Sequence, residues 1–408
     1  MAETVEIIEL GHGGDGIAEA TGGRVYVPLT LPGETVEIER KDGRGRPLKV
    51  VSASADRSEP ICRHFGACGG CALQHMERAA YLAWKRNIVA ESFARRGIEA
   101  QVEQIVSTAE NSRRRAVFSA VKTAKNVILG LHRKGTNEIV SIEECPVLVP
   151  AIVAKLGTFV EIANLSLKRG RPARVIVVAA DNGIDIAIEG AGRIGRTELE
   201  VLGRIAVDAA LARLTIDGNQ IFVNRRPEIR AGEAMLLPIP GGFLQATAAA
   251  EAALADALAD HIGEATPVAD LFAGIGTFTL RLARRAPVTA VESSAQLLAA
   301  IESAAHYTSR LKRVTPRKRD LFQNPLAATE LNQFGAVIFD PPAAGARAQA
   351  EAIAASNVTK IVAISCNPST LARDARILID GGYRLVRVLP IDQFLFSAEI
   401  EVIATFER

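Results

Sequence analysis

The sequence contains no long apolar segment and few cysteine, methionine or tryptophan residues. Its 408 residues include five Cys, three Met and one Trp. No uncharged apolar run is long enough to cross a bilayer, and the first residues, MAETVEIIELGHGGDG, lack the basic and apolar regions of a secretory signal. These absences argue against a membrane protein, and we expect the chain to stay in the cytoplasm.

The sequence also lacks a strong excess of charge of either sign. The formal net charge is +2, although 23% of the residues are charged. This balance does not by itself indicate a polyanionic partner, so any nucleic-acid binding must rest on local clusters. Two basic clusters occur, at residues 113–115 in NSRRRAVF and at residues 310–319 in RLKRVTPRKR. Taken alone, each is more often a solvated face than a phosphate-binding site.

Four of the five cysteines lie in two short segments. The stretch CRHFGACGGC places Cys62, Cys68 and Cys71 in a C-x5-C-x2-C pattern with glycines between them, and Cys145 follows in EECPVL. In a reducing compartment such a set is typical of metal or cluster ligation rather than of disulfides. Four thiolates suit either tetrahedral zinc or a 4Fe-4S cluster. The uneven spacing differs from the paired C-x2-C of zinc ribbons and favours iron and sulfur.

The hydrophobic pattern divides the chain into three domains and predicts a multidomain α/β protein. Residues 1–55 alternate apolar and polar side chains between glycine turns, which predicts an OB-like β-barrel, a fold that often binds single-stranded nucleic acid. Residues 56–240 hold the cysteine segment, an amphipathic helix around Tyr81 and Ile88, and apolar strands without legible chemistry, and form a central α+β domain. Residues 241–408 alternate apolar strands with Ala-rich helices, which predicts a Rossmann-like parallel sheet.

The third domain carries a glycine turn after its first expected strand. In PVADLFAGIGTFTLRL the strand ends at Asp270, and Gly274 and Gly276 precede a helix, which lets a ligand approach the backbone closely. The third glycine of a dinucleotide fingerprint is missing, which argues against NAD. The next strand, PVTAVESS, ends on Glu292, a carboxylate suited to accept hydrogen bonds from ribose hydroxyls. This combination is typical of an S-adenosylmethionine site.

Two further strand ends belong to the same edge of the expected sheet. GAVIFDPPAAG ends with Asp340 and two prolines, and KIVAISCNP ends with Cys366. Open α/β sheets bind ligands at the carboxyl ends of their strands, so we expect Cys366 beside the methyl donor. Methylation of an exocyclic amine needs no thiol. Methylation at C5 of a pyrimidine does, because a thiolate added to C6 makes C5 nucleophilic.

This chemistry also needs a base that removes the C5 proton. The C-terminal DQFLFSAEIEVIATFER offers Glu399 and Glu401, which share one side if the segment is a strand. The structural alternative is that Cys366 is only a small buried apolar side chain. The motifs on the neighbouring strands favour a nucleophile.

These motifs resemble the 5-methyluridine RNA methyltransferases, and within them the bacterial 23S rRNA uracil-5-methyltransferases with a TRAM domain and a 4Fe-4S cluster. GHGGDGIA and VYVPLTLPGE resemble the TRAM domain, CRHFGACGGCALQHM and EECPVL resemble the cluster segment, and FLQAT, DLFAGIGTF, DPPAAG and SCNPSTLARD resemble the catalytic domain. Only residues 150–235 carry no such motif. Ala343 and Thr277 stand where the family commonly has Arg and Asn.

The resemblance implies an enzyme that methylates uridine C5 in RNA with S-adenosylmethionine. By similarity, Cys366 is the nucleophile and Glu401 the base. The implied cluster ligands are Cys62, Cys68, Cys71 and Cys145, and the residues around the donor are Gln245, Phe272, Thr277, Glu292, Asp320 and Asp340. The implied partner is RNA, with 23S rRNA favoured over tRNA, and we expect a monomer.

Other functions stay open at the level of the sequence. A tRNA is the main alternative substrate, although bacterial tRNA relatives usually lack both the TRAM domain and the cluster. A non-catalytic RNA-binding protein on the same scaffold is disfavoured by Cys366 and the carboxylate downstream. A redox enzyme that uses the cluster would need a flavin or nicotinamide site, and the sequence offers none.

Overall fold

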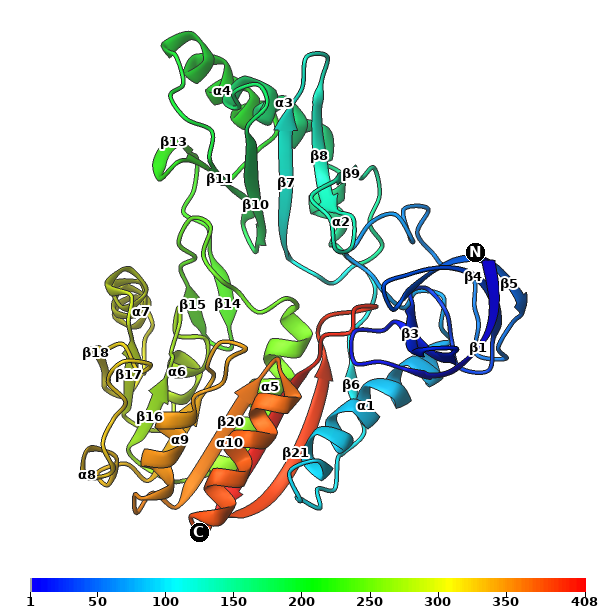
Figure 1. Ribbon diagram of the computed structural model, residues 1–408. Coiled ribbons are helices and arrows are strands. Elements are labelled where there is room, and N and C mark those ends of the chain that lie inside the picture. Colours follow the sequence, from blue (N-terminus) through cyan, green and yellow to red (C-terminus); the bar gives the residue numbers. More distant parts are fainter. Residues whose placement is uncertain (1) are drawn as a thin grey trace.

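The computed structural model describes residues 2–408 as a small barrel, a middle β domain and a C-terminal α/β domain (Figure 1). The barrel lies beside the middle domain, and the C-terminal domain lies below both in the view of Figure 1. No helix among these residues is long and apolar enough to cross a membrane.

The N-terminal barrel confirms the alternating pattern of the first residues. Its strands, which close in the order β1-β2-β3-β5-β4, are β1 (Ala2–Leu10), β2 (Gly16–Ala20), β3 (Gly23–Val27), β4 (Thr35–Lys41) and β5 (Arg44–Ser52). Every second apolar side chain points inward, so that Ile7, Val25 and Ile38 are fully buried. A Cβ at Gly16 would lie 2.2 Å from the Thr30 hydroxyl oxygen, so only glycine fits there.

The middle domain is a seven-stranded sheet in the order β13-β12-β11-β10-β7-β8-β9. Its strands are β7 (Arg115–Lys122), β8 (Val127–His132), β9 (Ile139–Ser141), β10 (Pro172–Ala180), β11 (Gly183–Glu189), β12 (Arg213–Ile216) and β13 (Asn219–Val223). Its helices are α2 (Pro150–Val153), α3 (Leu156–Ser166) and α4 (Arg196–Asp208). Phe159 of α3 packs on Phe118 of β7 with ring centroids 6.3 Å apart, so α3 covers one face of the sheet.

The C-terminal domain is an eight-stranded sheet in the order β18-β17-β16-β19-β20-β22-β21-β6. Its strands are β6 (Val106–Ser107), β16 (Val268–Leu271), β17 (Val288–Glu292), β18 (Val314–Lys318), β19 (Ala336–Phe339), β20 (Lys360–Ser365), β21 (Arg384–Asp392) and β22 (Glu401–Glu407). Strands β16 to β20 are parallel, and the strand order reverses between β16 and β19. Such a reversal leaves a crevice at the carboxyl ends of the strands, where open α/β sheets bind ligands.

Helices cover this sheet on both faces, as the alternation of strands and Ala-rich helices predicts. They are α5 (Ala248–Ile262), α6 (Thr277–Leu282), α7 (Ala295–Tyr307), α8 (Ala328–Leu331), α9 (Arg347–Ala354) and α10 (Pro368–Asp380). A short hairpin, β14 (Ile229–Ala231) and β15 (Ala234–Leu236), packs against α6 and α7. Two separate apolar clusters, one on each side of the sheet, form the core.

Residues 78–107 pack on the C-terminal domain although they precede the middle sheet in sequence. Helix α1 (Arg78–Ala94) lies against α10, and β6 pairs with β21 in parallel (Figure 1). Val89 and Phe93 of α1 are fully buried in the core of that domain. The amphipathic helix predicted around Tyr81 and Ile88 is therefore confirmed, and it links the cysteine segment to the catalytic sheet.

Candidate active site

A cavity of about 530 Å³ opens at the carboxyl ends of β16, β17, β19 and β20. It is lined by five of the six residues predicted around the donor, Gln245, Phe272, Glu292, Asp320 and Asp340, and by Cys366 and Glu401. Thr277 lines a smaller adjoining cavity of about 90 Å³, which shares Phe272 and Asp340. The fold thus brings together in one place the predicted nucleophile, the predicted base and the predicted donor residues.

The glycine turn after β16 allows a ligand to approach the backbone closely. Gly274 and Gly276 have φ values of 57° and 88°, a region that side chains disfavour. The Gly274 N–H donates to Oε2 of Glu292 at 3.1 Å, while the Ser294 N–H and the Ser293 hydroxyl donate to Oε1 at 2.9 Å each. These bonds fix the Glu292 carboxylate at the rim of the cavity.

Buried carboxyl groups lie at the floor of the cavity and beneath it, so the floor becomes negative when these groups ionise. Burial, with the negative charge of Asp270 adding to it, raises the pKa of Asp340 to about 7. Burial also raises the pKa of Asp270 to about 6, although the Thr279 hydroxyl donates to this carboxyl at 2.5 Å. A cation in the cavity would lower the cost of ionising both groups. The floor therefore suits a positively charged ligand.

Cys366 follows β20 directly and precedes the first turn of α10. Asn367 begins that helix as its N-cap, with its side-chain oxygen accepting the Ser369 N–H at 3.0 Å. The half-buried thiol faces the cavity, and burial raises its pKa to about 11, with the negative charges of Glu401 and Asp340 adding to the effect. In the absence of a ligand the thiol is therefore protonated at neutral pH.

Glu401 is the first residue of β22, and its side chain is buried against the cavity. Burial and the charge of Asp340 raise the pKa of Glu401 well above its usual value, and the hydrogen bond from Gln393 opposes this rise. Glu399 is exposed, lies before β22 and does not line the cavity. The condition under which Glu399 and Glu401 would share one side of a strand is not met, because the strand begins only at Glu401.

Two aromatic side chains also line this cavity, and a buried glutamine lies behind it. Phe322 is 52% exposed and packs against Phe272 with ring centroids 5.3 Å apart, and Phe243 is 66% exposed at the rim. Gln393, which is 1% exposed, contacts both Glu401 and Gln245. Phe322 follows the predicted Asp320 by two residues and Phe243 precedes Gln245 by two, so this spacing was an available signal. Nothing in the local sequence marked Gln393.

The arginines of the basic cluster at residues 113–115 make contacts within the protein, and a phosphate contact from them stays a prediction. Arg114 is buried in an ion pair with Glu251, and Arg115 donates to the Gly242 carbonyl at 2.9 Å. The Arg113 guanidinium lies over a ring of the active-site cavity, that of Phe394, 5.9 Å from its centroid. These arginines join the middle domain to the C-terminal domain. Sequence alone could not show this, because the partners are more than a hundred residues away.

The second basic cluster is divided between bound and exposed cations. Arg317 and Arg319 both pair with Glu330, and Arg319 also lines the active-site cavity. The other cations, Arg310, Lys312, Arg313 and Lys318, are exposed. A phosphate contact from this cluster stays a prediction.

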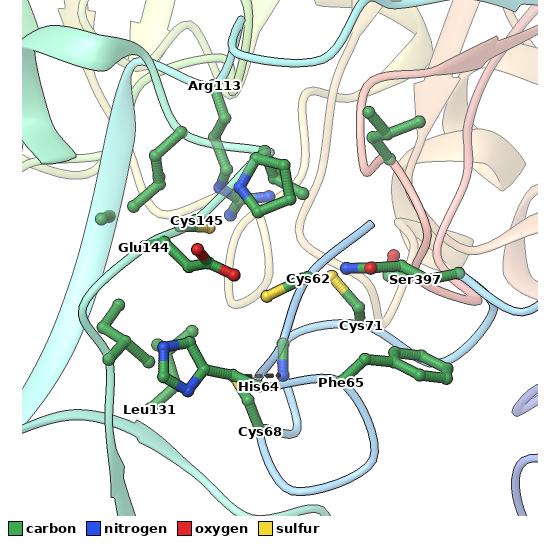
Figure 2. Close-up of a pocket in the computed structure, with 18 of the residues that line it drawn as sticks. Cys62, His64, Phe65, Cys68, Cys71, Arg113, Leu131, Glu144, Cys145 and Ser397 are labelled. Carbon is green, nitrogen blue, oxygen red and sulfur yellow. Dashed lines mark hydrogen bonds between the residues drawn. The ribbon is translucent and has the colours of Figure 1, made fainter. Parts of the chain in front are cut away.

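A second cavity, of about 210 Å³, is lined by Cys62, Cys68, Cys71 and Cys145 (Figure 2). The first three come from the loop before α1, and Cys145 comes from the loop between β9 and α2. A Cβ at Gly69 would lie 2.6 Å from the His132 carbonyl oxygen, so this glycine lets the loop pack against β8. Gly69 therefore allows close packing of the cysteine loop on β8.

The four cysteines around this second cavity are half-buried. Burial raises the pKa of Cys62 and Cys68, and it raises the pKa of Cys71 to about 12. Gln74 also lines the cavity, and its buried Oε1 lacks a hydrogen-bond partner among residues 2–408. Within the same residues, no three His, Cys, Asp or Glu side chains form a group that could hold a metal ion. The four thiols of the described chain therefore line a cavity, and they do not converge on a point that one metal ion could occupy.

One loop separates the two cavities. Between β21 and β22, Phe394 lines the active-site cavity, whereas Leu395 and Ser397 line the cysteine cavity. The N–H groups of Ala72 and Leu73 donate to the Phe396 carbonyl at 2.8 and 3.0 Å. The cysteine segment therefore contacts the backbone that leads to Glu401.

Comparison with known proteins identifies the family. A profile described as tRNA (uracil-5-)-methyltransferase matches residues 200–408, which include the whole active-site cavity. A protein of Brucella suis named an uncharacterized RNA methyltransferase is 44% identical over 99% of this chain and 97% of its own length. The chain belongs to the tRNA (uracil-5-)-methyltransferase family. The enzyme is an S-adenosylmethionine-dependent RNA (uracil-5-)-methyltransferase.

Two further relatives extend the comparison across the whole chain. The 23S rRNA (uracil(1939)-C(5))-methyltransferase RlmD of Edwardsiella ictaluri is 33% identical over 97% of this chain and 93% of its own. The structure of the Pyrococcus abyssi tRNA (uracil-54, C5)-methyltransferase covers 100% of both chains with a TM-score of 0.75 and 19% identity. The methyltransferase therefore shares its overall fold with that protein, including the barrel and the middle domain.

Proposed function

We propose that this methyltransferase acts on 23S rRNA through a covalent adduct between Cys366 and the target uracil. The observation that carries the proposal is the convergence of Cys366, Glu401 and Asp340 on one cavity at the carboxyl edge of the sheet. An enzyme that methylates an exocyclic amine would have no use for a thiol beside a buried carboxylate.

With these residues, methyl transfer to uracil C5 proceeds in four steps. Cys366 releases its proton to solvent, and the resulting thiolate adds to C6 of the uracil, which pushes the C5–C6 π electrons onto O4 as an enolate. C5 then attacks the methyl carbon of the donor, and the carbon–sulfonium bond breaks. Glu401 accepts the C5 proton. The bond between C6 and the Cys366 sulfur then breaks, which restores the ring double bond and the thiolate.

The predicted donor residues would contact four parts of S-adenosylmethionine: the ribose, the adenine, the sulfonium and the methionine part. Glu292, fixed by the glycine turn, accepts hydrogen bonds from the ribose hydroxyls, and the aromatic pair of Phe272 and Phe322 offers a flat apolar face to the adenine. Asp340 and the rest of the negative floor stabilise the sulfonium charge. Thr277, which lines the adjoining cavity, would contact the methionine part of the donor.

The target uridine must leave its stack to reach Cys366, at a cost of about a few kcal/mol. Loops and bulges of a folded RNA lower this cost. The exposed ring of Phe243 stands at the rim of the cavity, where it offers a stacking face to an extruded base. The barrel, which we assign to the TRAM type, adds a further RNA surface that includes the exposed Tyr26.

We infer that Cys62, Cys68, Cys71 and Cys145 hold a 4Fe-4S cluster. The cavity volume of about 210 Å³ is several times the roughly 30 Å³ share of one water molecule, so there is room for more than a single ion. Soft thiolate ligands suit iron and sulfur. When bound, the cluster would tie the loop before α1 to the loop after β9, which is a structural role.

The choice of 23S rRNA over tRNA rests on the relative named for 23S rRNA, which is similar over nearly the whole chain, and on the four clustered cysteines. The similarity to the tRNA enzyme of Pyrococcus abyssi concerns the fold only. A tRNA is the second candidate.

The test is a methyl-transfer assay with labelled donor on unmodified transcripts of 23S rRNA and tRNA, with the native chain and Cys366→Ala. We expect label at uracil C5 in 23S rRNA with the native chain only. Label in tRNA alone would overturn the substrate assignment, and label that persists with Cys366→Ala would overturn the covalent mechanism.

A further inference from the structure

The side chain of Gln393 lies buried between two groups of the active site. Its Nε2 donates to Oε2 of Glu401 at 2.6 Å and to Oε1 of Gln245 at 2.9 Å. Its Oε1 accepts the N–H of Ala246 at 3.0 Å. Both N–H groups and the carbonyl oxygen are thus occupied, and the Ala246 donor fixes which end of the amide is which.

These bonds also orient Gln245. Because Oε1 of Gln245 accepts from Gln393, its Nε2 is the end that is left to face the cavity. That nitrogen lies 3.5 Å from Oδ2 of Asp340. Gln245 therefore presents N–H donors, and not its carbonyl, to a ligand and to the carboxyl group on the floor.

The same glutamine controls Glu401. One carboxylate oxygen of Glu401 is held by Gln393, which leaves Oε1 for the cavity. Burial and the charges of Asp340 and Glu399 raise the pKa of Glu401, and the hydrogen bond from Gln393 is the interaction that lowers it. Loss of this bond would disfavour the ionised base.

Helix α1 supports the loop that carries Gln393. Asp392, directly before it, is fully buried and pairs with Lys85 at 2.6 Å and with the Tyr81 hydroxyl at 3.0 Å. Lys85 also donates to the carbonyls of Phe394 and Glu399, at 3.1 and 2.6 Å. The loop is thus fastened near both ends, which holds the Gln393 side chain in one place.

We propose that Gln393 is a positioning residue that aims Glu401 at the C5 proton and turns the amide of Gln245 toward the methyl donor. The proposal rests on the proposed role of Glu401 as base and extends it. The buried amide of Gln393 thereby connects Glu401, the proposed base, to Gln245, which faces the methyl donor.

The test compares Gln393→Met with Gln349→Met in the full-length chain. Gln349 is a matched control, because it is also 1% exposed in the same domain and bonds only the Leu326 backbone. An unmodified 23S rRNA transcript and S-adenosylmethionine serve as substrates. With Gln393→Met we expect kcat to fall about tenfold to a hundredfold, from the loss of a hydrogen bond to a charged group.

Two readouts separate positioning from general damage. With Gln393→Met, methylated RNA should stay attached to the protein on a denaturing gel, because adduct formation precedes the step that needs Glu401. The acid limb of the kcat profile should also move to higher pH, since a base with a raised pKa ionises later. Gln349→Met should change neither readout.

Each outcome decides between the proposals. A Gln393→Met enzyme with no retained adduct and an unmoved acid limb would overturn the positioning role. Glu401→Gln serves as the reference: if it retains no adduct either, the proposed base is wrong, whereas an adduct with Glu401→Gln alone refutes only the role of Gln393. Should Gln393→Met fail to fold, Gln393→Asn keeps a polar side chain there and shortens its reach, and the same two readouts apply.

Discussion

Cysteine lines both the active-site cavity and the cysteine cavity, but its neighbouring side chains differ between the two. Burial raises the pKa of the thiol in both, to about 11 at Cys366 and about 12 at Cys71. The charges around Cys366 are the carboxyl groups of Glu401 and Asp340, whereas those around Cys71 are the other thiols. A thiol beside a carboxylate suits proton transfer, and thiols that face one another suit a shared cation. The neighbours, and not the cysteine, distinguish a nucleophile from a ligand.

The two cavities are neighbours that share the loop from Gln393 to Glu399. Phe394 faces one cavity and Leu395 faces the other, and the cysteine segment bonds the carbonyl of Phe396 between them. A change in the cysteine cavity should therefore reach the active site through this backbone. Replacing Cys366 should have a smaller effect on the fold, because its thiol lines the active-site cavity and does not join two loops.

The largest expected difference between loss of activity and loss of stability comes from replacing Cys366. Cys366→Ala should lower methyl transfer by about 10⁴-fold or more, the scale seen when a covalent nucleophile is lost. The melting temperature should stay within about 2 °C, since the thiol lies at a cavity wall. Single-turnover kinetics and thermal unfolding measure the two effects. A large loss of stability would place Cys366 with the structural cysteines.

Removing one of the grouped thiols should show the opposite pattern. Cys145→Ala should lower the iron content per chain and the melting temperature, because ligand binding contributes to folding free energy. Methyl transfer should fall by about a hundredfold, the effect of a small displacement at a distant catalytic group. Iron analysis, thermal unfolding and the transfer assay test this. A variant with unchanged stability and activity would contradict the structural role of this cavity.

The negative floor offers a smaller test, on Asp340. Asp340→Asn should weaken donor binding by about tenfold, as expected for losing one charge-assisted interaction. The same change should raise the melting temperature at pH 8, because a carboxyl whose folded pKa of about 7 lies above its unfolded value destabilises the fold increasingly from about pH 4 and fully above pH 7. The gain should shrink as the pH falls from 7 and vanish below about 4, where Asp340 is protonated in both states. Calorimetry with S-adenosylmethionine and unfolding across pH measure both effects, and a stability gain independent of pH would contradict them.

Much of the catalytic sheet could be predicted from the sequence because its motifs sit at strand ends. Helix α5 spans Ala248–Ile262, the predicted AAAEAALADALADHI, and β17 ends on Glu292 as expected. Convergence of Glu292, Asp340 and Cys366 follows from parallel strands alone. The glycines among the cysteines likewise predicted a tight loop.

Other features depend on contacts that no local pattern contains. Arg114 was a basic surface residue by sequence and is a buried partner of Glu251, 137 positions away. Lys85 is a charged residue on a helix, for which exposure to solvent is the usual expectation, but it is fully buried against Asp392. Gln393 has no local signal in the sequence, and its role depends on Gln245 in the loop before α5 and on Glu401 at the start of β22. Such long-range polar pairs are invisible to periodicity, because only the fold creates them.

The smallest expected effect, and the sharpest comparison of the two cavities, concerns thiol reactivity. With the cysteine cavity loaded, iodoacetamide should modify Cys366 and spare the four grouped thiols, which a bound cluster protects. Since the pKa of Cys366 is about 11, its modification rate should rise about tenfold per pH unit from 7 to 10. S-adenosylmethionine should raise the rate at pH 8 about threefold or more over S-adenosylhomocysteine, because only the donor carries a sulfonium charge that favours the thiolate. The product, nearly the same in shape, controls for steric blocking. Mass spectrometry of the modified peptides measures each rate, and equal rates with both ligands would show that the donor charge does not reach the nucleophile.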